Sequence, residues 1–232
     1  MKPLARKFLI GVVVLAIGAV AGPWVYINLI KEDAPEALKL EPSAATTIVE
    51  ETVESTVQAS AVDGTWAIAT DSIVGYRVKE VIVAQSTEGV GRTSAVQGTL
   101  NIAGEQVTEA QFSVDMTTLK SDSSRRDGQV NNRILDTATY PTATFTLKQP
   151  ITLTPEALAG SDLTTQATGT LTLRGVTKDI ELTLIARLAN DVIEVNGSIE
   201  IIFADWSIPD PSISAIVVED RGQLEFLLRF TR

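Results

Sequence analysis

Apolar and polar residues alternate with a period of two along most of the chain from residue 65 onward. The clearest alternating runs lie at residues 96–102, 110–116, 180–184 and 224–230. This period is typical of strands with one apolar and one solvated face, which antiparallel sheets tolerate and parallel sheets normally do not. Many such strands joined by short turns predict an all-β domain, built as a sandwich or a barrel.

One tight turn follows from the register of the apolar faces. A two-residue loop at Arg174-Gly175 pairs Leu173 with Val176 and keeps the apolar residues of both strands on the same face. Glycine supplies the positive φ that such hairpins need. We therefore predict a hairpin at this position.

A second candidate turn, Asn196-Gly197, has a composition typical of hairpins. A turn there would, however, mix apolar and polar residues on each face of the two strands. We therefore predict a continuous strand through residues 193–203, preceded by a turn at residues 189–191.

Residues 121–138 break the alternation. Asp122 or Ser124 can cap a short helix that carries Arg125 and Arg126. We predict that this helix lies near one mouth of a barrel, and an irregular polar loop is the alternative.

The N-terminal part of the chain contains an uncharged, largely apolar run over residues 8–30. As a helix, this run is long enough to cross a hydrocarbon core of about 30 Å. Lys2, Arg6 and Lys7 precede it, and the positive-inside rule then leaves the rest of the chain on the extracytoplasmic side. We predict a single-pass transmembrane helix in the cell membrane. The alternative is a signal peptide cleaved after Ala21, which gives a secreted domain.

Residues 32–61 are acidic, rich in Thr, Ser, Ala and Glu, and contain no aromatic residue. Because such a segment has little to bury, we predict a flexible linker with at most a transient helix near residues 35–40. The predicted organisation is therefore an anchor or signal at residues 1–31, this linker, and one β domain at residues 62–232.

The composition argues against several classes of function. The net charge is −10, and no cluster of Lys and Arg occurs beyond the N-terminal segment, so nucleic acid is not an expected partner. The chain has no Cys and no His, which removes Ser-His-Asp triads, thiolate nucleophiles and the commonest metal ligands. Asp122, Asp127 and Asp136 could be imagined as a carboxylate cluster, but loop caps and turns explain them. We therefore expect no enzyme activity, no cofactor and no metal site.

Several segments, taken in order, carry a family resemblance. They are GTWAI and DSIVGYRVK at residues 64–68 and 71–79, the stretch from RD to YPTATF at 126–145, GTLTLRGVTK at 169–178, and DWSI at 205–208. In this arrangement the chain resembles the YceI-like, polyisoprenoid-binding family over roughly residues 64–230.

This resemblance implies an extended, antiparallel, lipocalin-like β-barrel of about eight strands. It also implies a bound isoprenoid or other long lipid and no catalytic residues. The residues that we predict to line the barrel interior are Trp66, Tyr76, Phe112, Val114, Phe145, Leu173, Gly197, Ile199, Phe203, Trp206 and Phe226. For each of them, a packed core residue is the alternative. Arg125 and Arg126 are candidates for meeting a phosphate head group at the mouth, with surface ion pairs as the alternative.

The leading hypothesis is a membrane-anchored, extracytoplasmic protein that holds a polyisoprenoid or similar long-chain lipid inside the barrel. An apolar tunnel is sufficient for such a ligand, because each buried CH₂ contributes about 0.8 kcal/mol. The alternative is an envelope interaction or stress-related domain whose barrel is filled by side chains. The two hypotheses differ in whether the barrel contains a cavity.

Overall fold

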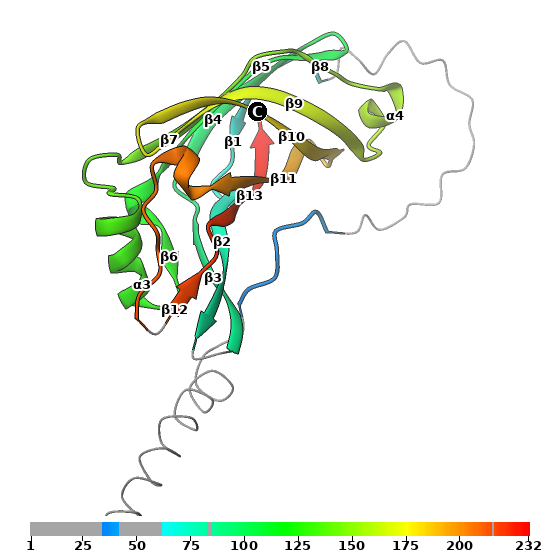
Figure 1. Cartoon of the computed structure of the whole chain (residues 1–232). Coiled ribbons are helices and arrows are strands. Elements are labelled where there is room, and N and C mark those ends of the chain that lie inside the picture. Colours follow the sequence, from blue (N-terminus) through cyan, green and yellow to red (C-terminus); the bar gives the residue numbers. More distant parts are fainter. Residues whose placement is uncertain (1–33, 42–61, 83–84, 215) are drawn as a thin grey trace, which may run out of the picture.

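The computed structural model describes residues 34–41, 62–82, 85–214 and 216–232, and these residues build a closed antiparallel β-barrel (Figure 1). In the described chain, eight strands follow one another around the wall in chain order, and the last pairs with the first. They are β1 (Gly64–Ile68), β4 (Val96–Ala103), β5 (Gln106–Asp115), β7 (Thr142–Leu147), β9 (Leu163–Leu173), β10 (Val176–Ala189), β11 (Val192–Ile202) and β13 (Arg221–Thr231). The predicted eight-stranded barrel is therefore confirmed.

Two further strands lengthen the barrel at one end (Figure 1). β2 (Ile73–Ile82) continues along β13 where β1 stops, and β3 (Gln85–Thr93) pairs with β2. Three short strands pair with the edges of longer ones: β6 (Lys120–Ser121) with β3, β8 (Ile151–Thr152) with β5, and β12 (Ile216–Val218) with β2. The barrel is thus extended along the direction of its strands.

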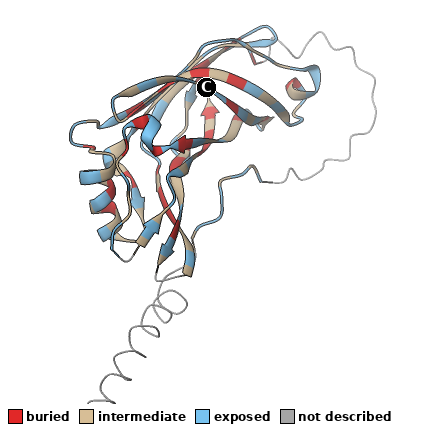
Figure 2. Cartoon of the chain, in the orientation of Figure 1, coloured by how far each residue is buried: buried red, intermediate tan, exposed pale blue. Residues whose placement is uncertain are grey.

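The alternating apolar positions point into the barrel, as their period of two requires. Along β13, the inward-facing Phe226, Leu228 and Phe230 are only 5%, 1% and 2% exposed. Figure 2 shows how the buried positions are distributed along the wall. Phe112 of β5 and Phe145 of β7 occupy a registered pair and stack with ring centroids 5.0 Å apart. The apolar core is therefore a lining of the wall rather than a layer between two sheets.

The β9–β10 hairpin has the predicted register. Leu173 pairs with Val176, and the two loop residues Arg174 and Gly175 have φ values of 50° and 74°. Positive φ at both positions matches the twist of antiparallel strands that are joined by a two-residue loop.

The strand through Asn196 and Gly197 is continuous, as predicted, because both residues lie inside β11. The turn before it is at Asn190 and Asp191, which have φ values of 50° and 60°. The apolar residues of β11 therefore lie on one face of a single strand, and no turn at Gly197 interrupts that face.

Short helical segments occupy several connections between strands. α3 (Ser124–Gln129) continues into the π-helical turn η3 (Val130–Ile134), which confirms the short helix predicted near one end of the barrel. Further segments in the described chain include α4 (Pro155–Leu158) and the 3₁₀ turns η2 (Met116–Thr118) and η4 (Phe203–Trp206).

The N-cap of α3 differs from the prediction. Ser123 is the cap, and its side-chain oxygen accepts a hydrogen bond from the backbone amide of Arg126. Asp122 is instead ion-paired with the Arg126 guanidinium, and Ser124 already lies inside the first turn. The prediction of Asp122 or Ser124 as the cap is therefore wrong.

Residues 34–41, which we call the strap, lie extended on the outside of the barrel wall (blue in Figure 1). Four side chains of the wall donate hydrogen bonds to main-chain carbonyls of the strap. They are Arg77 to Pro35 (2.6 Å), Arg92 to Glu36, Asn196 to Leu38 (3.0 Å) and Arg187 to Glu41 (2.7 Å). The predicted transient helix at residues 35–40 is wrong, because these carbonyls bond to the wall and not to amides one turn along the chain.

The predicted membrane anchor at residues 8–30 and the alternative cleavage site at Ala21 lie outside the described residues. Most of the predicted linker does so as well. Among the residues that the structure describes, no helix is both long enough and apolar enough to span a bilayer. The anchor stays a prediction from the sequence.

Candidate ligand-binding cavity

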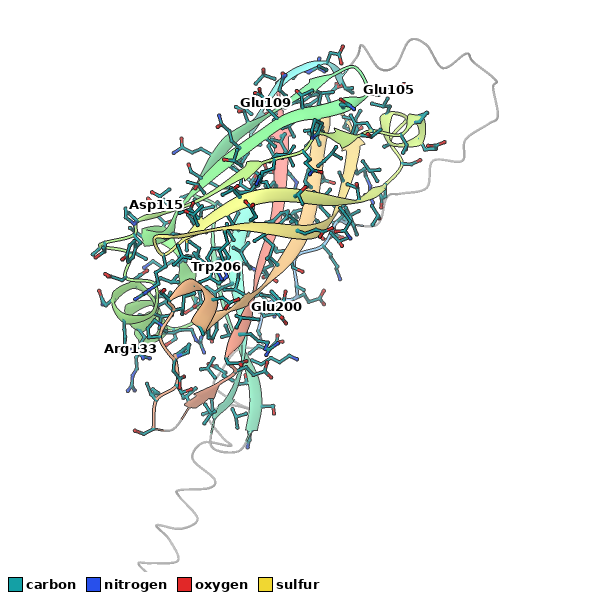
Figure 3. All side chains as sticks on the ribbon, turned by 45° about the horizontal axis from the view of Figure 1, so that its top comes forward. Glu105, Glu109, Asp115, Arg133, Glu200 and Trp206 are labelled. Carbon is teal, nitrogen blue, oxygen red and sulfur yellow. The ribbon has the colours of Figure 1, made fainter. Side chains whose placement is uncertain are left out.

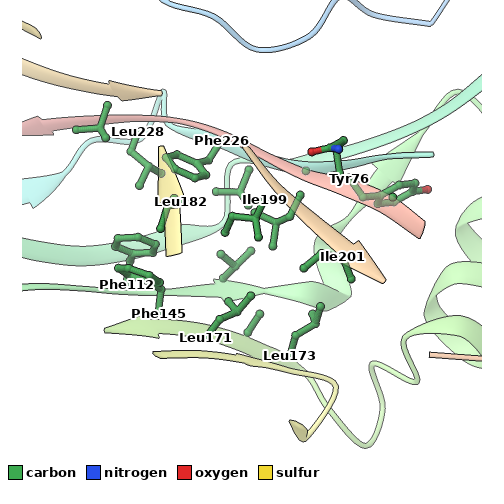
Figure 4. A pocket seen from close by; sticks show the side chains of 18 of the residues that line it. Tyr76, Phe112, Phe145, Leu171, Leu173, Leu182, Ile199, Ile201, Phe226 and Leu228 are labelled. Carbon is green, nitrogen blue, oxygen red and sulfur yellow. The ribbon is translucent and has the colours of Figure 1, made fainter. Parts of the chain in front are cut away.

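The barrel contains a cavity of about 560 Å³, a volume within the range of roughly 300–1,000 Å³ that is typical of small-molecule sites. Apolar side chains from different strands surround it (Figure 4). Leu171 and Leu173 of β9 lie on one side, and Ile199 and Ile201 of β11 lie on the other (Figure 4). Such a wall suits an aliphatic chain better than a polar ligand, because a polar group would lose its water without gaining partners.

Most of the residues predicted to line the barrel border this cavity. They are Tyr76, Phe112, Val114, Phe145, Leu173, Ile199, Phe203 and Phe226. Their contact with a ligand stays a prediction. Further lining residues that the sequence analysis left out of its candidate set include Leu100, Leu171, Leu182, Ile201 and Leu228. The period-two pattern places several of these on the inward face, but it does not show which inward residues border the cavity.

Two predicted lining residues, Trp66 and Trp206, are buried in the core and do not border the cavity. The Trp66 indole donates a hydrogen bond to the Val62 carbonyl (2.9 Å), and the Arg232 guanidinium lies 4.4 Å from the centre of its ring. Trp206 packs in η4, where the Lys178 ammonium lies 5.7 Å from the ring centre. Both indoles are therefore packed core residues, the alternative that the sequence left open.

Gly197 does not leave open space for a ligand. A Cβ added there would come within 2.6 Å of Cζ of the Phe226 ring. The ring therefore lies over the glycine, and the absence of a side chain allows this close approach to the backbone of β11. Phe226, and not Gly197, borders the cavity at this level.

The two ends of the cavity differ in character. At one end, which we call the α3 mouth, the lining includes Glu80, Asp122, Arg125, Arg126 and Gln129. At the other, the α4 end, the charged lining residue is Arg187, and the wall between the two ends is predominantly apolar. Figure 3 shows Arg133 of η3 near the first end and Glu105 of the β4–β5 turn near the opposite one. In the described part of the chain, no group of acidic side chains is arranged to hold a metal ion.

Arg126 is occupied by protein carboxylates. Its guanidinium binds Glu80 at 2.8 Å, whose side chain is only 4% exposed, and also pairs with Asp122. Burial lowers the pKa of Arg126, but the two carboxylates outweigh this effect and raise the pKa overall, so the guanidinium stays charged. This agrees with the ion-pair alternative. Arg125 is exposed, borders the mouth and has no ion pair within the described chain, so any head-group role falls to Arg125.

Tyr76 supplies a neutral polar group to the wall near the same mouth. Burial raises the pKa of its phenol, so the hydroxyl is protonated at neutral pH. Its ring lies against Gly91, the residue opposite it in the β2–β3 pairing, where a side chain would overlap it. Tyr76 can therefore offer a hydrogen bond to an uncharged polar atom of a ligand.

Arg187 is a feature that the sequence analysis missed. It is 9% exposed, and its guanidinium donates two hydrogen bonds to the Asp162 carboxylate, at 2.5 and 2.9 Å, besides the one to the Glu41 carbonyl. Hydrogen bonding between the two side chains raises the pKa of Arg187 and lowers that of Asp162. No sequence signal linked these three positions, which are brought together only by the closed barrel and the strap.

Comparison with solved structures supports the fold. One similar structure is a polyisoprenoid-binding domain from Saccharophagus degradans implicated in plant cell wall breakdown. It is 23% identical in sequence, the alignment covers 72% of this chain and 98% of that domain, and the TM-score is 0.58. Another is BcnA from Burkholderia cenocepacia, which is 18% identical, covers 67% of this chain and 95% of its own, and has a TM-score of 0.51. At these identities the likeness shows the fold alone.

Sequence comparison identifies the family. A search of curated proteins found no match. The YceI-like domain family matches residues 46–230, which is most of the chain. The chain therefore belongs to the YceI-like family.

Proposed function

We propose that this protein holds one long-chain, largely apolar lipid, a polyisoprenoid or a similar molecule, inside its barrel and that it is a binding protein rather than an enzyme. The observation that carries the proposal is the cavity of about 560 Å³, whose wall is predominantly apolar and whose charged residues are confined to its ends. The relative from S. degradans is described as a polyisoprenoid-binding domain, which supports this class of ligand. The cavity also argues against the alternative of a filled barrel.

Hydrophobic burial alone can hold such a ligand. Each buried methylene contributes about 0.8 kcal/mol, so ten of them contribute roughly 8 kcal/mol before the costs of association are subtracted. A ligand with many polar groups would find few partners along this wall, and the loss of its hydration would oppose binding. The cavity therefore favours chain-like apolar molecules. Binding such a molecule requires no catalytic residue of the protein.

We further propose that residues 8–30 anchor the protein in the cell membrane with the barrel on the extracytoplasmic side. The support is the uncharged apolar run and its basic N-terminal flank. Protease added to whole cells should remove the barrel and leave an N-terminal stub in the membrane. Recovery of a secreted form that begins at Gly22 would instead show cleavage of a signal peptide.

Extraction of the purified full-length protein with organic solvent, followed by mass spectrometry, tests the ligand. Ala110 of β5 borders the cavity, so Ala110→Phe places a ring in the space of the lipid. Gln111, the next residue on the same strand, is exposed, so Gln111→Phe is the matched control.

We expect one long-chain lipid in the wild type and in Gln111→Phe. We expect about tenfold less in Ala110→Phe, because overpacking of the cavity opposes binding by about 1–3 kcal/mol. A wild-type protein that retains no lipid would reject the carrier in favour of an interaction domain. Equal lipid content in the two variants would show that the ligand lies elsewhere.

A further inference from the structure

The α3 mouth has an apolar rim that faces outward. Val81, Ile213 and Val217 are 39%, 40% and 63% exposed, and they are three of the five large apolar side chains that are exposed in the described chain. Val81 and Val217 are opposite each other in the β2–β12 pairing, and Ile213 forms a bridge with Ile216, the residue before Val217. Exposed apolar side chains that gather in this way mark an interaction surface.

This rim adjoins the wall of the cavity. Ile82 and Ile216, the sequence neighbours of Val81 and Val217, border the cavity, and Ile213 belongs to both surfaces. The alternation of the strands places one set of side chains inside and the other outside. An apolar molecule that enters at the rim therefore passes directly onto the apolar wall.

The strap leads toward the same end of the barrel. Its Pro35 carbonyl is held by Arg77, which lies four residues before Val81 on β2. Its other end is held at Glu41 by Arg187, at the α4 end of the cavity. Followed toward the N-terminus, the strap therefore runs from the α4 end toward the half of the barrel that carries the α3 mouth.

Little chain separates the strap from the apolar run. Only residues 31–33 lie between Ile30 and Ala34, and the four steps from one to the other can span at most about 14 Å. If residues 8–30 form the anchor proposed above, Ala34 lies within that distance of the end of the anchor. Because the strap is bonded to the wall, the barrel then has little freedom to turn its α3 mouth away from the bilayer.

We propose that the α3 mouth docks on the lipid bilayer that holds the anchor, with Val81, Ile213 and Val217 inserted at the level of the head groups. The lipid ligand then passes between the bilayer and the cavity without crossing water. The exposed Arg125 guanidinium, beside the mouth, is placed to meet an anionic head group. This inference rests on the anchoring proposed above, and its test uses the full chain.

Fluorescence quenching measures the docking directly. The chain has no native Cys, so Val217→Cys can be labelled at the rim and Ser161→Cys, an exposed residue of the α4 end, serves as the control. Each full-length variant is reconstituted in phosphatidylcholine–phosphatidylglycerol vesicles that contain nitroxide-labelled lipid. We expect quenching of the rim label to be several-fold stronger than that of the control. Equal quenching at the two positions, or none at the rim, overturns the proposal.

Transfer kinetics separate docking from ligand binding. The probe is a fluorescent derivative of geranylgeraniol, offered either in vesicles or in detergent. Val217→Glu should take up the probe from vesicles about tenfold more slowly, because a carboxylate opposes insertion at the bilayer surface. The amount bound from detergent should not change, since Val217 does not border the cavity.

The two measurements fail in different ways. If the wild type binds no probe from detergent, the carrier function is rejected, and the quenching data alone still decide the docking. If the wild type binds the probe, but Val217→Glu takes it up from vesicles at the wild-type rate, the docking is rejected and the carrier function stands.

Discussion

The turns of the barrel allow backbone strain to be separated from steric overlap. Gly175 has a φ of 74°, and a Cβ added there would come within 2.5 Å of Cε1 of the Tyr140 ring. Gly104, in the β4–β5 turn, has a φ of 61°, and no atom lies within 4 Å of an added Cβ. Substitution by alanine therefore adds strain alone at Gly104, and both strain and overlap at Gly175.

The magnitudes follow from these geometries. A side chain held at positive φ costs about 1–2 kcal/mol, and insertion into a packed site costs about 1–3 kcal/mol more. We expect Gly104→Ala to lower the free energy of unfolding by about 1–2 kcal/mol and Gly175→Ala by about 2–5 kcal/mol. Gly175→Val should lie at the upper end, because its branched Cβ is larger. In a Tyr140→Ala background the overlap is removed, so Gly175→Ala should cost no more than Gly104→Ala does.

Urea unfolding of the full-length protein in a mild detergent, followed by tryptophan fluorescence, measures all of these variants. The double-mutant cycle between Gly175 and Tyr140 isolates the overlap from the other contacts that Tyr140 makes, including that with the Arg174 guanidinium 5.8 Å from its ring centre. An unchanged midpoint for Gly175→Val would refute the assigned turn. A Gly175→Ala cost that persists without the Tyr140 ring would refute the overlap as its cause.

Three further predictions concern the wall and the strap. Phe145→Ala, which removes one ring of a buried stack, should lower the free energy of unfolding by about 3–5 kcal/mol, measured by the same urea titration. Arg187→Met should release the end of the strap at Glu41 and speed tryptic cleavage after Lys39, measured by mass spectrometry. Arg221→Met, which removes an exposed ion pair elsewhere, should leave the cleavage rate unchanged. Hydrogen bonding to Arg187 lowers the pKa of Asp162 in the folded protein. The ionised Asp162 therefore stabilises the fold at any pH above its pKa in the unfolded chain, and this stabilisation is lost as the pH falls through its lower pKa in the folded protein. The stability advantage of the wild type over Asp162→Asn should therefore shrink as the pH falls below about 4; a constant difference would contradict the coupling.

The barrel could be predicted because its main determinant is local in sequence. A period of two fixes which side chains share a face, and it placed Leu173 and Val176 correctly in the β9–β10 hairpin. The same pattern cannot show which inward residues border a cavity. Whether an inward residue borders the cavity depends on whether a neighbouring side chain covers it, as the Phe226 ring covers Gly197. The two residues lie on strands that are distant in sequence, so their packing leaves no local sequence signal.

The strap could not be predicted from composition. Its binding uses main-chain carbonyls, which every sequence has, and its partners are side chains on strands far apart in the chain. An acidic segment without aromatic residues has little apolar surface to bury, and the usual inference of flexibility follows from that alone. What composition could not show is that Arg77, Asn196 and Arg187 offer hydrogen-bond donors to the backbone of residues 34–41.

The wall that faces the cavity and the surface that binds the strap depend on the same strand register. On β13, Leu224 and Phe226 face the cavity, and Glu225 between them faces outward but is only 4% exposed. Its carboxylate binds Arg77 at 3.3 Å and Arg92 at 2.8 Å, and these two guanidiniums hold the first carbonyls of the strap. Glu225 thus orients the donors that the strap requires. A slip of β13 by one residue would turn this carboxylate into the apolar cavity and remove Phe226 from the wall, so the register that forms the cavity wall also forms the site of the strap.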